Sequence, residues 1–474
     1  MQPKYNITLM YIERLIDKEL LAWKNASTHK PLLLRGARQV GKSSSVRHLA
    51  TFFDYFIEVN LERNEELKSL FTSNTNVREI ANQLGGLYGV PVVPGKTLVF
   101  IDEIQVCENA IKSLWFFKED YPELHVIAAG SLLEFALKNI RSFCVGRIRS
   151  MFMYPLSFDE FLLAEGKKTW VDCKRNADSD HPLFDTMHKG LVDEFRKYLI
   201  VGGMPACIVQ WLSTNDYLAC AAEQEDIHQK YYDDFVKYSE RIDPQLLRNT
   251  LHSVVVQTGS KFVYSRVEGG YRTDDIKRAL TMLCDAGLIK EVMHTAANGA
   301  PLGAEGNPKF KKYIFLDSGL LLRICDLYLG GAKEQMNVIM LGTAADLVNK
   351  GGLTEMVAGW ELIKYSSPRV RHELYYWENL ERGTTSEVDY ILMNEGKVMP
   401  IEVKSGVSGK MKSLRLFMQK KNITNAIRAS LENFGKLTVK DEANDEERQI
   451  SILPLYAISN FSSSYFSEVT FDVL

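Results

Sequence analysis

The stretch Pro31-Leu-Leu-Leu-Arg35, followed directly by Gly36-Ala-Arg-Gln-Val-Gly41-Lys42-Ser43, decides the fold of this chain. An apolar run of strand length precedes a loop with two glycines, and residues 44–50 have a helix-compatible spacing. The GxxxxGK[ST] pattern in this strand–loop–helix context is typical of a phosphate-binding loop. Backbone N–H groups and the helix N-terminus would hold phosphate, Lys42 would reach the outer phosphates, and the Ser43 hydroxyl would ligate Mg²⁺. The residues expected to hold ATP are Gly36, Ala37, Arg38, Gln39, Val40, Gly41, Lys42, Ser43 and Ser44.

A second apolar run, at 97–101, ends in Asp102 and Glu103. Parallel sheets place their ligands at the carboxyl ends of their strands, so both acids would lie near the loop. Asp102 would hold magnesium through water, and Glu103 would polarise the attacking water. Two acids that simply cap the next helix are the alternative. The adjacent glutamate favours water as the acceptor, so hydrolysis ranks above a small-molecule kinase.

A third apolar run, at 125–129, is followed by Gly130 and Ser131. Ser131 has two interpretations. As a polar group beside the phosphate strand it could sense the γ-phosphate. Followed by Leu-Leu-Glu134, it also looks like a helix N-cap with its capping-box partner. The sequence leaves both open.

Composition describes a globular protein with no special electrostatic partner. The chain has 474 residues, 46% hydrophobic and 25% charged, which suggests about three domains. A net charge of −3 gives no global attraction to nucleic acid or acidic lipid, so such a partner would need a local patch. The seven cysteines form no disulfide or metal-knuckle spacing. With no secretory leader and no run of about 18 apolar residues, we expect a cytoplasmic protein without membrane spans.

Three regions differ in character. Residues 1–215 alternate apolar runs at 31–35, 56–60, 97–101 and 125–129 with helical patterns, which predicts an α/β domain whose parallel sheet is covered by helices on both faces. Residues 216–330 are mainly helical, and residues 331–474 place a helix at 353–364 before strand-like runs. These are the three expected domains.

The middle region resembles a winged helix. In a helix expected over 273–283, Ile276, Leu280 and Leu283 share one face, which leaves basic side chains on another. Strands expected at 288–293 and 312–316 flank a glycine-rich loop that ends in lysines. A recognition helix and basic wing could touch DNA phosphates. The candidate DNA contacts are Lys277, Arg278, Lys309, Lys311 and Lys312. Packing between domains, or protein binding, is the equal alternative.

The last region contains two paired strands, at 386–392 and 399–406 with a turn at 394–396, that resemble the restriction-endonuclease-like core. Alternation puts Glu402 and Lys404 on one face, and Asp389 could lie beside them. That resemblance implies Mg²⁺ on Asp389 and Glu402, water oriented by Lys404, and an additional acid at Glu355 or Glu361. The sequence allows two interpretations of this core: an active nuclease, or a nuclease-like fold that has lost its catalytic activity.

Taken together, the motifs resemble the archaeal-type AAA+ ATPases over nearly the whole chain. The residues that carry this are 35–43, Phe100-Ile-Asp-Glu-Ile-Gln105, Gly130-Ser131, Val145-Gly-Arg147, Tyr154-Pro-Leu-Ser-Phe-Asp-Glu-Phe161 and Gly202-Gly-Met-Pro205. Ala37 departs from the proline frequent in that family. The resemblance implies that Arg147 is an arginine finger or sensor, whereas the residues alone also allow a solvated or salt-bridged side chain.

The leading hypothesis is a Mg²⁺-dependent ATPase coupled to a DNA-facing winged helix and a nuclease-like domain, with a homo-oligomer as a candidate assembly. The alternative is a nucleotide-loaded switch whose C-terminal domain recognises a protein partner without catalysis.

Overall fold

The computed structural model describes residues 11–72, 76–130, 133–134, 137, 146–325, 350–381, 386–406, 411–440 and 446–462. The chain divides into two compact units. The first comprises Met1–Leu156, Asp285–Leu288 and Ser367–Arg371, and the second comprises Ser157–Cys284, Ile289–Ser366 and His372–Leu474. The boundaries expected near residues 215 and 330 both fall within the second unit, so the division into three domains stays a prediction.

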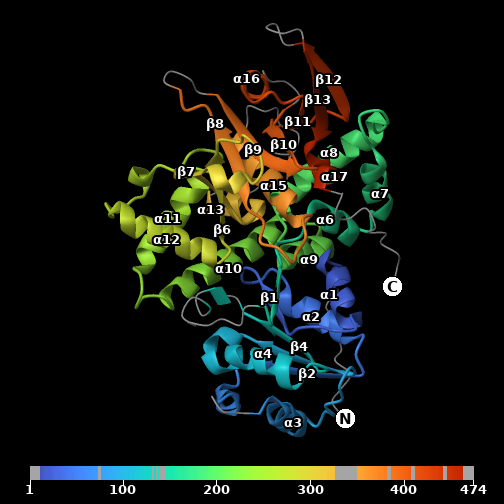
Figure 1. Ribbon diagram of the computed structural model, residues 1–474, viewed down its shortest axis with the longest axis vertical. Helices are drawn as coiled ribbons and strands as arrows, with labels where there is room; N and C mark the ends of the chain where they lie inside the picture. The colour runs from blue at the N-terminus through green and yellow to red at the C-terminus, as the bar shows by residue number, and fades with distance from the viewer. Residues whose placement is uncertain are drawn as a thin grey trace. The chain divides into compact units, whose positions relative to one another are not determined.

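The first unit contains a five-stranded parallel sheet in the order β2-β3-β4-β1-β5 (Figure 1). Its strands are β1 (Leu32–Arg35), β2 (Tyr55–Asn60), β3 (Thr97–Asp102), β4 (His125–Ala129) and β5 (Arg149–Phe152). Its helices are α1 (Ile16–Asn25), α2 (Lys42–Ala50), α3 (Val77–Tyr88) and α4 (Glu108–Asp120), with 3₁₀ turns at Glu65–Leu70 and Ile104–Val106. The α/β class expected from the alternating runs is confirmed.

Helices cover both faces of this sheet because alternate residues of each strand point to opposite sides. On one face, Ile57, Val59 and Ile101 join a core with the apolar stripes of α3 and α4. On the other face, α2 packs against β3 and β4, and α1 packs against α2. Burial on both sides explains why β1, β3 and β4 are nearly continuous apolar runs without alternation.

The strand order positions the candidate site. Strand β4 lies between β1 and β3, and all three are parallel. The loop that follows β1, the acids that end β3 and Gly130 after β4 therefore meet at one edge of the sheet, the carboxyl edge where open α/β sheets bind ligands.

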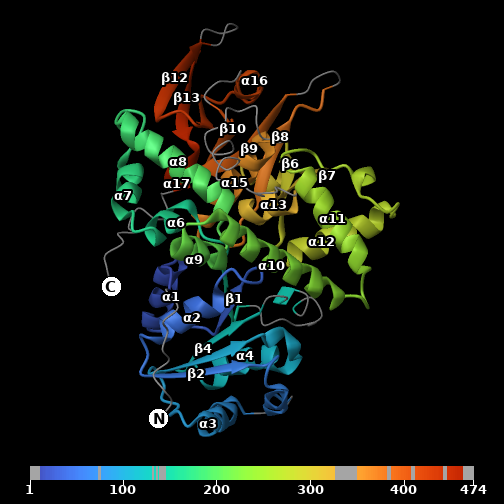
Figure 2. The same cartoon turned by 180° about the vertical axis from the view of Figure 1, so that it is seen from behind.

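The second unit contains an eight-stranded mixed sheet in the order β12-β13-β11-β10-β9-β8-β6-β7 (Figure 2). Its strands are β6 (Ile289–Thr295), β7 (Gly306–Phe315), β8 (Leu374–Glu378), β9 (Glu387–Asn394), β10 (Lys397–Val403), β11 (Asn425–Ser430), β12 (Gly435–Lys440) and β13 (Glu447–Pro454). Its helices are α6 (Phe158–Ala164), α7 (Lys168–Asn176), α8 (Asp185–Val201), α9 (Pro205–Thr214), α10 (Tyr217–Val236), α11 (Pro244–Val256), α12 (Thr273–Asp285), α13 (Ser318–Ile324), α15 (Lys350–Lys364), α16 (Lys412–Lys421) and α17 (Ser459–Ser462), with 3₁₀ turns at Tyr264–Arg266, Leu302–Glu305 and Leu455–Ala457.

The hairpin β6–β7 belongs to the same sheet as the C-terminal strands, because β6 pairs in parallel with β8. Strands β9 and β10 form the expected antiparallel hairpin, with Asn394 opposite Lys397. Its two turn residues, Glu395 and Gly396, have φ values of 48° and 76°, as tight two-residue hairpin turns require. Helix α16 packs on one face of this sheet, while α15 contacts β7 and β10.

Among the residues that the structure describes, no helix combines the length and the apolar character needed to cross a membrane.

Candidate nucleotide site and carboxylate cluster

The loop after β1 has the backbone of a phosphate cradle. Gly36 passes so close to the chain after β5 that a Cβ would overlap the carbonyl oxygen of Met153. Gln39 and Gly41 have φ values of 66° and 99°, and Gly41 is the N-cap of α2. Left-handed residues of this kind let successive backbone N–H groups converge on an anion, and the N-terminus of α2 adds the positive end of the helix dipole.

Lys42 lies over this cradle. Its Nζ donates to the carbonyl oxygens of Gly36 and Ala37, at 2.9 and 2.7 Å, and the side chain is buried. Burial lowers the pKa of Lys42 to about 8, against the opposing effect of Glu103 and Asp102. A desolvated, positively charged amine held beside the loop can form charge-assisted hydrogen bonds with the outer phosphates of a nucleotide.

Ser43 and Asp102 come together as the sequence predicted. The Ser43 hydroxyl donates to Oδ2 of Asp102 at 3.0 Å. Burial, and then the neighbouring Glu103, raise the pKa of Asp102. A hydroxyl and a buried carboxylate at the edge of a phosphate loop are oxygen donors of the kind Mg²⁺ prefers, and it keeps waters and phosphates as its other ligands. The donor set fits magnesium.

Glu103 is held by a residue that the sequence argument missed. Gln105 donates from Nε2 to Oε2 of Glu103 at 2.5 Å. The same amide lies against the end of β4, where a Cβ on Gly130 would overlap its Oε1. Glu103 itself has a left-handed backbone, with φ 51°. The available signal was position, because Gln105 follows the two acids by two residues in the stretch 100–105.

Arg14 is a second missed residue. Its guanidinium donates to the carbonyl oxygen of Val40 in the loop at 2.8 Å and to that of Tyr154 at 2.7 Å. The side chain is buried. It thus ties the phosphate loop to the chain that follows β5. No local motif marks this residue, because its partners are 26 and 140 residues away.

Two predicted residues remain, Ser131 and Arg147. Ser131 lies outside the described residues. Arg147 precedes β5, whose residue Arg149 pairs with Leu32 at the start of β1, so it lies at the amino edge of the sheet. The length of β1 alone separates that edge from the loop by roughly 10 Å. There Arg147 donates to Glu119 at 2.5 Å and covers the Trp115 ring.

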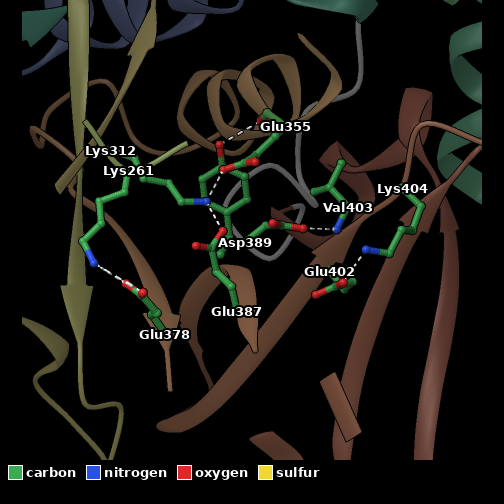
Figure 3. Close-up of polar contacts among 10 residues, drawn as sticks. Lys261, Lys312, Glu355, Glu378, Glu387, Asp389, Glu402, Val403 and Lys404 are labelled. Carbon is green, nitrogen blue, oxygen red and sulfur yellow. Dashed lines mark hydrogen bonds and ion pairs between the residues drawn. The ribbon is translucent and has the colours of Figure 1, made fainter. Parts of the chain in front are cut away.

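In the second unit, acids from two elements, α15 and β9, surround one lysine (Figure 3). Lys312 on β7 has a fully buried side chain, and its Nζ donates to Glu355 of α15 at 2.9 Å and to Glu387 of β9. Burial raises the pKa of Glu355 to about 8, although Lys312 opposes the shift. Oxygens of Glu355, Glu387 and Asp389 lie within 4.8 Å of one another, as in a metal site. Glu387 was not predicted, but alternation in the stretch 386–390 places it on the face of Asp389.

The residues of the expected nuclease-like pattern are close together. Asp389 accepts a hydrogen bond from the backbone N–H of Val403 at 2.7 Å, and Lys404 pairs with Glu402. Burial, and then Asp389, raise the pKa of Glu402 to about 7. The additional acid in this cluster is Glu355. Glu361 instead accepts from the N–H of Phe158 and the hydroxyl of Tyr198.

The candidate DNA contacts divide into two groups. Lys277, Arg278 and Lys309 are exposed, and Lys311 is partly exposed. The first two pair with acids three residues earlier on α12, and Lys311 pairs with Glu291. The expectation for Lys312 is wrong, because its amine is buried between two carboxylates and cannot meet a phosphate.

Family models match three segments of the chain. Residues 28–162 match a family model described as an AAA domain. Residues 192–329 and 350–458 match two models described as domains of unknown function, DUF8612 and DUF4143. A search of curated proteins found no match.

Three solved structures resemble parts of the chain. The Walker-type ATPase PABY2304 of Pyrococcus abyssi shares 16% identity over 66% of this chain and 96% of its own, with a TM-score of 0.42. Drosophila ORC bound to DNA shares 12% identity over 68% of this chain and 89% of its own, with a TM-score of 0.28. Aeropyrum pernix ORC1 in complex with DNA shares 12% identity over 68% of this chain and 94% of its own, with a TM-score of 0.26. These scores are too low to carry a functional argument. The conclusion rests on the loop, on the acids beside it and on the family match: residues 28–162 are similar to an AAA domain, which supports ATP binding and ATPase activity for this chain.

Proposed function

We propose that the first unit hydrolyses ATP with Mg²⁺ and that turnover is coupled to a DNA-facing winged helix and a nuclease-like core in the second unit. The observation that carries the hydrolytic part is the 3.0 Å bond from Ser43 to Asp102, beside a Glu103 that Gln105 holds in place. A kinase would need a site for a second substrate at this edge, whereas water needs only an oriented base.

The residues of the loop have distinct roles in this proposal. Backbone N–H groups of the loop bind the phosphates, and Lys42 moves its ammonium from loop carbonyls to phosphate oxygens. Ser43 and Asp102 would hold Mg²⁺, which supplies charge neutralisation at the phosphates when bound. Glu103 accepts the proton of the attacking water. Ser131 stays a candidate sensor. Arg147, at the opposite edge, would act from a neighbouring copy.

The DNA-facing part is supported by element order in the second unit. Helix α11, a bridge between Lys261 and Lys312, the turn at Tyr264–Arg266, α12 and the hairpin β6–β7 follow one another as in a winged helix. Lys277 and Arg278 lie exposed on α12. Their i,i+3 ion pairs are surface pairs of about 0 to 1 kcal/mol, which a DNA phosphate can replace.

A second candidate function is a nucleotide-loaded switch whose C-terminal region recognises a protein partner without catalysis. The position of Lys312 among the carboxylates of Glu355 and Glu387 favours it, because Glu355 is the additional acid that the nuclease-like resemblance would use for metal. Metal binding by Asp389 and Glu402, with water oriented by Lys404, stays a prediction.

Phosphate release, measured with and without duplex DNA, tests the proposal. Glu103→Gln should bind ATP but turn over at least ~100-fold more slowly, the scale of a lost general base. Glu108→Gln is the matched control, since Glu108 is an exposed acid paired with Lys112 on α4. A Glu103→Gln enzyme at full rate would exclude Glu103 as the base. Wild type that holds ATP with little turnover, with or without DNA, would favour the switch.

A further inference from the structure

Lys312 occupies an unusual place for a lysine. It lies in the middle of the ten-residue strand β7, and its side chain is fully buried. Its neighbour Lys311 points to the other side of the strand, where it is partly exposed and pairs with Glu291 at 2.9 Å. Alternation along β7 therefore sends one lysine toward solvent and the other into the protein.

The surroundings of Lys312 compensate its buried charge. Its amine lies between Glu355 on α15 and Glu387 on β9 (Figure 3). It is also 5.1 Å from the centre of the Tyr376 ring. A buried ammonium is tolerated only where such partners replace its lost hydration. The compensation is mutual, since the two carboxylates and Asp389 would otherwise repel one another.

The same three acids have the arrangement of a divalent metal site. Their oxygens lie within 4.8 Å of one another. A Mg²⁺ or Mn²⁺ ion bound by them would lie about 2.1 Å from each ligand oxygen. The Lys312 amine is 2.9 Å from Glu355 and also contacts Glu387, so it lies between two of the three acids that would have to approach the ion. Ion and ammonium cannot both be there.

Asp389 and two nearby acids, Glu402 and Glu378, also have partners within the protein. Asp389 accepts from the backbone of Val403, and Glu402 pairs with Lys404. Lys261 pairs with Glu378 at the end of β8. Each of these contacts comes from within the second unit: the first joins β9 to β10, and Lys261, which forms a β-bridge with Lys312 of β7, reaches β8.

We infer that Lys312 is the resident cation of the Glu355–Glu387–Asp389 cluster and excludes a divalent metal from it. The lysine takes the electrostatic role that a metal has in a nuclease-like core, and it joins the hairpin β6–β7 to that core. This inference does not rest on ATP hydrolysis in the first unit.

Counting bound Mn²⁺ on the full-length protein without nucleotide, by equilibrium dialysis, tests the inference. Every protein carries Asp102→Asn and Glu402→Gln, which remove the candidate metal position of the first unit and the candidate pair of Asp389 with Glu402. We expect no Mn²⁺ at the cluster in this parent protein. Lys312→Met, which keeps the length and removes the charge, should gain about one Mn²⁺ per chain. Adding Asp389→Asn should abolish the gain. Lys311→Met is the matched control, and it should gain none.

Two results would overturn the inference. One is a parent protein that binds Mn²⁺ and loses it with Asp389→Asn, which needs no variant at Lys312 and decides the question even where Lys312→Met does not fold. The other is a Lys312→Met protein with a native circular dichroism spectrum that gains no metal.

Discussion

Replacing Gln105 by alanine should slow ATP hydrolysis without weakening ATP binding. Gln105 touches neither the phosphate loop nor its lysine among the contacts found in the described residues. It donates to Oε2 of Glu103 at 2.5 Å, and its amide fills the space beside Gly130. Its removal should therefore free the Glu103 carboxylate to rotate away from the attacking water while leaving the nucleotide contacts intact.

The magnitude follows from the kind of bond. A hydrogen bond to a charged group contributes about 1.5 to 3 kcal/mol, which corresponds to roughly 10- to 150-fold in rate if it acts wholly in the transition state. Because a freed carboxylate still visits the productive position, we expect kcat to fall about tenfold. The KM for ATP should change less than about twofold.

Steady-state phosphate release by four proteins measures this: wild type, Gln105→Ala, Glu103→Gln and the double variant. If Gln105 acts through Glu103, replacing Gln105 by alanine should slow turnover little further in a protein that already carries Glu103→Gln. Gln83→Ala is the matched control, because Gln83 makes a comparable bond to Glu79 on the exposed side of α3. Effects that multiply in the double variant would refute the positioning role, and so would a raised KM with unchanged kcat.

The remaining predictions concern Arg147 and His125. Arg147→Ala should slow turnover only if copies assemble, since in its own chain the side chain pairs with Glu119; activity recovered on mixing it with Glu103→Gln would support action in trans, and a full-rate variant would exclude the role. Burial, and then the stacked His29, lower the pKa of His125 to about 4. The unfolded chain therefore binds more protons than the folded chain below about pH 6.5. The contribution of His125 to the free energy of unfolding is fully present above that pH and falls toward pH 4 by at most about 1.4 kcal/mol per pH unit. The urea midpoint of unfolding should fall less steeply with decreasing pH in His125→Gln than in wild type. Equal slopes of midpoint against pH in the two proteins would contradict His125 as the origin of the acid destabilisation.

Local chemistry was readable from the sequence. A phosphate loop is built from consecutive residues between a strand and a helix, so the pattern at residues 36–43 was enough to predict it. The four apolar runs of the first unit became β1 to β4 with boundaries shifted by one residue at most. Asp102 was placed beside Ser43 because the edge of a parallel sheet follows from strand direction alone.

Long-range partners were not readable. Arg14 reaches a loop 26 residues away, and no spacing rule connects the two. Arg147 was assigned from resemblance, but the pairing of β5 with β1 places it at the far edge of the sheet. Strand β5 itself was not predicted, because four residues with only one fully buried side chain carry little pattern.

The sequence by itself determined that a phosphate loop, two acids after a strand, and the pattern of Asp389, Glu402 and Lys404 exist in this chain, because each is a run of neighbours or a period-two alternation. Only the tertiary structure decided what surrounds them. Lys309, Lys311 and Lys312 read as one basic wing, yet β7 is a strand and its successive side chains face opposite ways. Which of the two faces is buried depends on β8 continuing the sheet and on α15 packing against β7. That packing turns Lys312 from a candidate DNA contact into a buried partner of Glu355 and Glu387.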